Sequence, residues 1–279
     1  MLGAGVLGGP CARNLLAGEP DAPPAVRAGL VTDVHYADRE MRINRFYRES
    51  RAKLRESIDR FNRFRTDFVV ELGDLIDAAD WLEEEIGHLE TIEREFRRFE
   101  GERHYVLGNH CVHSLTKEEF LEHSGAAATF YSFDRGPFHF VVLDACYRED
   151  GVAYGRGNFH WTDTEIPPAQ REWLEADLGA TGKPAVVFVH QRLDVENRYG
   201  VASAPRVREI LEASGRVAAV FQGHSHENDY REIGGIPYCT LRAMVEGSGE
   251  ENSGYGLLEL FPDRSLRLTG FRKQANRRF

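Results

Sequence analysis

The chain has 279 residues, 42% of them hydrophobic and 29% charged, so it can bury a large core without disulfides. Its formal net charge of −10 argues against a protein that coats nucleic acid, because such a protein needs a basic face. No run of eighteen apolar residues occurs, so we expect no membrane-spanning helix.

The first 24 residues differ in character from the rest of the chain. Residues 1–9 are mostly small and apolar, and a proline-rich stretch follows at residues 20–24. This pattern fits a loosely docked terminus, or the trimmed end of an export signal without its basic region. We therefore predict a flexible segment over 1–24 and one domain over 25–279. We expect a cytoplasmic protein, with export as the alternative.

The four cysteines lie far apart and show no Cys-x-x-Cys spacing, which disfavours a zinc knuckle or a disulfide framework. They are Cys11, Cys111, Cys146 and Cys239. We expect free thiols in a reducing compartment.

Short apolar strands alternate with charged, amphipathic helices in the first part of the chain. We predict strands over 26–34, 68–72 and 104–107, and helices over 39–65, 81–100 and 117–123. Alternating aromatic residues over 129–133 and 138–143 then predict a β-hairpin. A long loop over 144–164 follows it.

The last part of the chain begins with the same alternation and ends in hairpins. We predict helices over 168–178 and 204–214, and strands over 184–189, 217–221, 232–233, 236–241, 256–261 and 265–271. Helix-separated strands followed by hairpins indicate an α/β fold, with two β-sheets packed face to face and helices outside.

Each apolar strand of the α/β part ends in a polar cluster. The clusters are Asp33-x-His35, Gly73-Asp74-x-x-Asp77, Gly108-Asn109-His110, His190 and Gly223-His224-x-His226. The carboxyl ends of strands build the site in open α/β sheets, and oxygen and nitrogen donors without thiolates suit Mn, Fe or Zn. One carboxylate shared between two such ions would hold them roughly 3.5–4 Å apart, as two-metal hydrolases require.

These five clusters, in this order, resemble the motif series of the calcineurin-like metallophosphoesterases. The resemblance implies a four-layer α-β-β-α sandwich of two mixed β-sheets flanked by helices, and two divalent metal ions as cofactors. It also implies a division of the ligands between the two ions. Asp33, His35 and His226 would bind the first ion, Asn109, His190 and His224 the second, and Asp74 both.

The resemblance also implies catalytic roles for His110 and Asp77. His110 would donate a proton or a hydrogen bond to the leaving group, and Asp77 would orient it, although Asp77 also fits a helix N-terminal carboxylate. The chain departs from the family pattern at Cys111, where the family often has Asp or Glu, and we expect an inert buried thiol there. It departs again at Arg192, which is expected either to clamp a phosphate or to be a solvated loop residue.

Several stretches are further similar to the Mn-dependent ADP-ribose/CDP-alcohol diphosphatases. They include residues 33–38, 72–77 and 170–174 and the tail over 240–270. This likeness implies a small phosphorylated substrate, such as a nucleoside diphosphate derivative. Tyr36, Tyr255 and the Phe159-His160-Trp161 loop are candidates to stack its base, although aromatic residues are more often part of the core.

We therefore expect an enzyme that hydrolyses a small phosphodiester or diphosphate bond. A phosphomonoesterase or a phosphoprotein phosphatase with the same two-metal site is the alternative. A non-catalytic binding module on this scaffold is disfavoured because every ligand position is filled. No pattern in the sequence indicates an oligomeric state.

Overall fold

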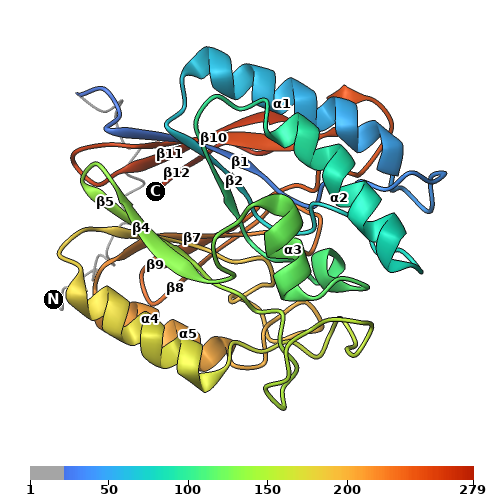
Figure 1. Cartoon of the computed structure of the whole chain (residues 1–279). Coiled ribbons are helices and arrows are strands. Elements are labelled where there is room, and N and C mark those ends of the chain that lie inside the picture. The colour runs from blue at the N-terminus through green and yellow to red at the C-terminus, as the bar shows by residue number, and fades with distance from the viewer. Residues whose placement is uncertain (1–21) are drawn as a thin grey trace, which may run out of the picture.

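Two six-stranded mixed β-sheets lie face to face in residues 22–279, the part of the chain that the computed structural model describes (Figure 1). Cys11 and nearly all of the predicted flexible segment 1–24 lie outside the described residues, and the boundary at residue 25 stays a prediction. The other three cysteines are buried and free, as expected.

The first sheet has the strand order β12-β11-β10-β1-β2-β3. Its parallel strands are β1 (Val26–Val31), β2 (Phe68–Glu71) and β3 (Glu102–Tyr105). Helices α1 (Ser50–Phe64) and α2 (Leu82–Phe96) connect them. The antiparallel strands are β10 (Gly254–Leu260), β11 (Leu266–Arg272) and β12 (Arg277–Arg278), so the end of the chain returns beside β1.

The second sheet has the strand order β4-β5-β6-β7-β9-β8. Its strands are β4 (Tyr131–Arg135), β5 (Phe138–Val142), β6 (Ala185–Phe188), β7 (Val217–Gln222), β8 (Asp229–Ile233) and β9 (Ile236–Thr240). Helices α4 (Pro168–Ala180) and α5 (Ala204–Ser214) cover its outer face, while α3 (Lys117–Ser124) lies on the side of α1 and α2 (Figure 1).

Three apolar clusters fill the spaces between the four layers. The central cluster joins the two sheets through residues such as Leu30, Phe68 and Phe140. The others lie beneath α1–α3 and beneath α4–α5. Burying one face of each helix and both faces of each sheet in this way is the main favourable contribution to folding. The predicted four-layer α-β-β-α sandwich is confirmed.

The predicted helix over 39–65 is too long at its start. A 3-10 turn over Tyr47–Glu49 precedes α1, and residues 39–46 form a loop. Arg42 and Arg45 exchange backbone hydrogen bonds of 3.2 and 3.0 Å across a tight turn, in which Ile43 has a φ of 60°. These local bonds replace helical ones, so the loop is free to lie over the ends of the strands. None of the helices in residues 22–279 has the length and apolar character needed to cross a membrane.

Candidate metal centre

The polar clusters that end the strands of both sheets meet at one place. The Asp33 amide donates a hydrogen bond to the Gly73 carbonyl at 2.9 Å, and the His224 amide donates to the Asp33 carboxylate at 3.1–3.2 Å. The Gly223 amide donates to the His190 carbonyl at 3.1 Å. These bonds hold the loops after β1, β2, β6 and β7 against one another.

The backbone at this place adopts conformations that side chains usually avoid. Five non-glycine residues of the motifs have φ between 44° and 71°, in the left-handed region: Asp33, His35, Asp74, His224 and His226. Such strain persists only where the surroundings impose it, and it is concentrated at functional sites.

Two motif glycines allow the loops to approach closely. A Cβ on Gly108 would lie 2.2 Å from Oδ1 of Asp74, and one on Gly223 would lie 2.1 Å from Oγ1 of Thr32. Any side chain at either position would push the loops apart.

The first group of donor atoms comes from Asp33, His35 and His226. Nδ1 of His35 donates to Asp77 at 3.0 Å, and Nδ1 of His226 donates to Glu246 at 2.8 Å. Each bond leaves Nε2 as the nitrogen with the free lone pair. These two Nε2 atoms lie 3.1 Å apart, and that of His226 lies 3.3 Å from Oδ1 of Asp33. Two lone pairs this close require a cation or a proton between them.

The second group comes from Asp74, His190 and His224, with Asn109 beside them. Nδ1 of His190 donates to the Leu72 carbonyl at 2.8 Å, which turns Nε2 toward Oδ2 of Asp74 at 3.1 Å. Nδ1 of His224 lies 3.3 Å from Nε2 of His190, so it faces the same group. Oδ1 of Asn109 is buried and has no hydrogen-bond partner within residues 22–279. A buried acceptor without a partner is costly, so the Asn109 oxygen indicates a missing ligand.

Asp74 lies between the two groups. Its Oδ2 is 3.1 Å from Nε2 of His190 and 3.5 Å from Nε2 of His35. Burial opposes its ionisation, but the charges of His190, His110 and His35 outweigh burial and lower the pKa of Asp74. An ionised carboxylate is therefore available to both groups.

The histidines differ in their affinity for protons. Burial lowers the pKa of His224 to about 3, so its imidazole is neutral and can act as a ligand. At His226 burial acts in the same direction, but the carboxylates of Asp33 and Glu246 outweigh it and raise the pKa to about 9. The surroundings of His226 therefore favour a positive charge at this place.

The residues present fit a pair of divalent cations. In each group the donor atoms of the Asp and His residues lie within 4.8 Å of one another, and the donors are oxygen and nitrogen without thiolate. This fit rests on three separate features: the unpartnered Asn109 oxygen, the close Nε2 atoms of His35 and His226, and the Asp74 carboxylate between the two groups.

A family model for calcineurin-like phosphoesterases matches residues 26–228, which include all five motif clusters. This chain belongs to the calcineurin-like phosphoesterase family. A manganese-dependent ADP-ribose/CDP-alcohol diphosphatase of Danio rerio is 30% identical to this phosphoesterase, over 87% of this chain and 94% of that protein. The enzyme of that name from Arabidopsis thaliana is 29% identical, over 88% of this chain and 94% of that protein.

Solved structures share the fold of this phosphoesterase. A dimetal phosphatase from Danio rerio superposes with a TM-score of 0.79 at 22% identity, covering 91% of this chain and 98% of that one. A purple acid phosphatase from yellow lupin superposes with a TM-score of 0.58 at 15% identity, covering 90% of this chain and 52% of that one. The match to the family model, and not these structures, makes this phosphoesterase a metal-dependent hydrolase.

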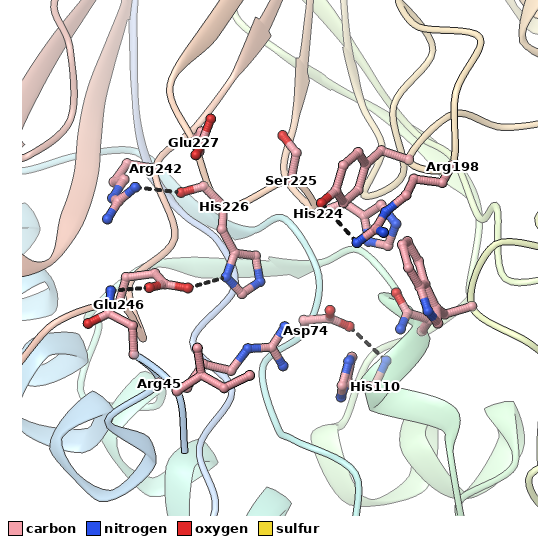
Figure 2. A pocket seen from close by; sticks show the side chains of 15 residues that line it. Arg45, Asp74, His110, Arg198, His224, Ser225, His226, Glu227, Arg242 and Glu246 are labelled. Carbon is pink, nitrogen blue, oxygen red and sulfur yellow. Dashed lines mark hydrogen bonds and ion pairs between the residues drawn. The ribbon is translucent and has the colours of Figure 1, made fainter. Parts of the chain in front are cut away.

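A cleft of about 700 Å³ opens over both donor groups of the phosphoesterase. Arg45 reaches from one side toward Asp74, and Arg198 lies on the opposite side beside His224 (Figure 2). Trp161 and Tyr199 also line the cleft. Arg45, Arg198 and Tyr199 belong to no motif, and Arg45 lies within the helix predicted over 39–65, so the sequence does not indicate them as site residues.

His110 and Asp77 lie together at the edge of the cleft. Nδ1 of His110 is 2.5 Å from Oδ1 of Asp77, and the amide of His110 donates to Oδ1 of Asp74 at 2.8 Å. Asp77 is buried, and it also contacts Arg39 and His35. The side chain of His110 keeps 26% of its surface exposed, so it faces the place where a substrate would lie.

Three predicted substrate contacts do not reach the cleft, and these predictions are corrected. Tyr255 is fully buried, packs edge-on against Phe61, and donates its hydroxyl to Glu56. Tyr36 is also part of the core beneath the helices. Both rings lie in strands or strand-like segments whose apolar face points inward.

Arg192 is the third corrected residue. Its guanidinium binds Asp194 at 2.7–2.9 Å and Asp229 at 2.6 Å, and only 6% of the residue is exposed. It is therefore neither a solvated loop residue nor free to clamp a phosphate. A further hydrogen bond, at 3.3 Å to Ser225, shows that it supports the loop that carries His224 and His226.

Cys111 is fully buried, and burial raises the pKa of its thiol well above the ordinary value. The thiol is therefore protonated and unreactive at neutral pH. This agrees with the expectation of an inert residue.

Manganese is expected to stabilise the folded protein, because the unfolded chain does not hold these donors together. At a free concentration a hundred times the dissociation constant, the gain from one ion is about 2.7 kcal/mol, which in a chain of this size is a rise in Tm of about 5 °C. Differential scanning fluorimetry with Mn²⁺ and with EDTA measures it. Asp33→Asn should reduce the rise, because it removes a ligand of one of the two ions, whereas the exposed control Asp134→Asn should keep it. A wild-type Tm that does not respond to Mn²⁺ would contradict the assignment.

Proposed function

We propose that this phosphoesterase uses two divalent ions, manganese first among them, to hydrolyse the diphosphate bond of a small nucleoside diphosphate derivative, of the ADP-ribose or CDP-alcohol type. Asp33, His35 and His226 hold one ion, and Asn109, His190 and His224 hold the other. Asp74 binds both. The observation that carries the proposal is the cleft: it combines the two donor groups with cationic and aromatic side chains.

Two bound ions would supply a hydroxide nucleophile and neutralise the charge that builds on the phosphate oxygens. The protein's own groups do the rest. His110 hydrogen-bonds to the leaving oxygen, and the Asp77 carboxylate holds the imidazole in place for that role. Arg45 reaches into the cleft between the two sides and binds the phosphate that is not attacked.

The opposite side of the cleft suits a nucleobase. The guanidinium of Arg198 lies 5.0 Å from the centre of the Trp161 ring and 5.1 Å from that of Tyr199. Both rings stand edge-on to His224, at 5.6 and 5.8 Å between centroids. A base stacked on this aromatic surface would leave its diphosphate beside the donor groups. The diphosphatases named above act, by their names, on substrates of this class.

The experiment is a substrate panel with Mn²⁺-loaded protein. It contains ADP-ribose, a CDP-alcohol, dimethyl diphosphate as a diphosphate diester without a base, a phosphomonoester and a phosphopeptide. We expect the nucleoside compounds to give the highest kcat/KM. Faster turnover of the phosphomonoester or the phosphopeptide would favour the alternative, and no turnover of any phosphoester by metal-loaded protein would overturn the proposal.

Trp161→Ala tests the base-binding side of the cleft. Stacking of a base on an aromatic ring is worth about 1–3 kcal/mol, so KM for ADP-ribose should rise about tenfold or more. The kinetics with dimethyl diphosphate should change little, and Trp161→Phe should restore most of the loss. An equal effect on both substrates would show that Trp161 supports His224 and does not bind the base.

A further inference from the structure

Lys53, on α1, is fully buried and its amine lies among four consecutive backbone carbonyls. Its Nζ is within 2.6–3.3 Å of the carbonyl oxygens of Met244, Val245, Glu246 and Gly247. An ammonium has three N–H donors and no acceptor, so it satisfies such a set of carbonyls well. Burial lowers the pKa of Lys53 to about 8, which leaves the amine mostly protonated at neutral pH.

The residue just before this helix binds the next part of the segment with the opposite charge. Glu49, one turn before Lys53, accepts hydrogen bonds from the Gly249 amide at 2.6 Å and the Ser248 hydroxyl at 3.1 Å. The Lys53 ammonium thus binds backbone carbonyls, and the Glu49 carboxylate binds a backbone amide and a hydroxyl. The start of α1 is therefore a two-point attachment for residues 244–249, the segment between β9 and β10.

That segment supports the candidate metal centre in two ways. Its backbone is bonded to the loop after β1, since the Val245 amide donates to the Asp33 carbonyl at 3.1 Å. The carboxylate of Glu246, within this segment, accepts a hydrogen bond from Nδ1 of His226 at 2.8 Å (Figure 2). This bond fixes both the tautomer and the orientation of the imidazole, and partners of this kind tune the affinity of a metal site.

We infer that Lys53 is a positioning residue for the metal centre: its ammonium holds the 244–247 segment in the conformation that lets Glu246 orient His226. The inference rests on the proposed metal role of His226. A neutral side chain at position 53 would remove the ammonium donor from the carbonyl oxygens of Met244, Glu246 and Gly247, which is unfavourable. The Val245 carbonyl would keep the bond that it accepts from the Phe46 amide at 3.0 Å. The segment would move to find other partners, and Glu246 would move with it.

The effect of losing Lys53 should be confined to the ion that Asp33, His35 and His226 are proposed to bind. His190, His224 and Asn109 have no hydrogen bond to residues 244–247 among the bonds of the described chain. His226 belongs to the other group, with Asp33 and His35. Loss of Lys53 should therefore weaken binding at the Asp33 group and spare the His190 group.

The test measures Mn²⁺ binding to Lys53→Ala by titration calorimetry, with the wild type beside it. We expect one of the two sites to lose about 10–100-fold in affinity and the other to keep its affinity. Propylammonium has the atoms that the variant lacks, from Cγ to Nζ, so adding it should restore the weakened site. Tetramethylammonium has no N–H donor and should not.

Lys117→Met is the matched control, because Lys117 is also buried but its amine binds the Asp144 carboxylate at 2.6 Å. Lys117→Met should lower the stability of the protein without selectively weakening the binding of Mn²⁺ at one of the two sites. If Lys53→Ala does not fold, Lys53→Gln keeps two N–H donors, and the same loss of one ion is expected on a smaller scale. Hydrogen exchange of amides 244–249 in the wild type provides a second measurement, and exchange should slow when Mn²⁺ is added.

Two results would overturn the inference: wild-type affinity at both sites in folded Lys53→Ala, or equal weakening of both sites with no response to propylammonium. Neither depends on turnover. A wild type that binds two Mn²⁺ ions but hydrolyses no phosphoester would refute the proposed function and leave this inference standing.

Discussion

Replacing Asp74 by asparagine should lower kcat/KM for ADP-ribose by about a thousandfold or more. The Asp74 carboxylate lies between the two donor groups, with Oδ2 3.1 Å from Nε2 of His190 and 3.5 Å from Nε2 of His35. A neutral amide has nearly the same shape but offers a weaker ligand and no negative charge. Metal ions contribute several kcal/mol of transition-state stabilisation, and about 4 kcal/mol corresponds to a factor of a thousand.

The measurement is steady-state kinetics over a range of Mn²⁺ concentrations, together with the number of ions bound at each. Asp80→Asn is the matched control, since Asp80 is an exposed carboxylate six residues further along the same loop. It should keep near-wild-type rates. Rates close to wild type in Asp74→Asn, at any Mn²⁺ concentration, would rule out the role assigned to Asp74.

The second large effect is expected at His110. His110→Asn should lower kcat for ADP-ribose about a hundredfold to a thousandfold, because general acid catalysis contributes factors of this size. The loss should depend on the leaving group. A p-nitrophenyl phosphodiester releases a stable phenolate that needs no proton, so its kcat should fall less than about tenfold.

The comparison of the two substrates is the decisive part of this experiment, because a general loss of metal would affect both equally. Asp77→Asn should show the same dependence on the leaving group, since Oδ1 of Asp77 is 2.5 Å from Nδ1 of His110. It should also affect metal binding, because Asp77 accepts from His35 at 3.0 Å. Equal losses for both substrates in His110→Asn would show that His110 acts on the metal centre and not on the leaving group.

Much of the site can be predicted from the sequence because its motifs follow strands. Asp33, Asp74, His190 and His224 each come shortly after an apolar run, and parallel strands end at the same edge of a sheet. The order of strand and cluster along the chain therefore indicates that these residues meet. The same alternation of strands and helices predicts the layers of the fold.

Side chains outside the motifs could not be placed in this way, because their partners are far away in the sequence. Arg192 is bound by Asp229, 37 residues further on. Tyr255 is enclosed by α1, whose Glu56 is 199 residues away. The nearer partner of Arg192, Asp194, lies only two residues away, but this spacing alone does not predict that both side chains are buried.

The extent of the helix before Ser50 was missed for a related reason. Residues 39–46 have the charge pattern of a helix, but the chain turns at Ile43 and pairs Arg45 with Glu246 of a distant segment. That turn places Arg45 at the cleft. The sequence predicts the residue types proposed to hold the ions, and the fold is needed to show which residues surround them.

The most direct test of the two-metal centre is anomalous diffraction from crystals grown with Mn²⁺, recorded above and below the manganese edge. We predict two anomalous peaks, one among Asp33, His35 and His226 and one among Asn109, His190 and His224, with the Asp74 carboxylate between them. A single peak, or two peaks that do not share Asp74, would contradict the account.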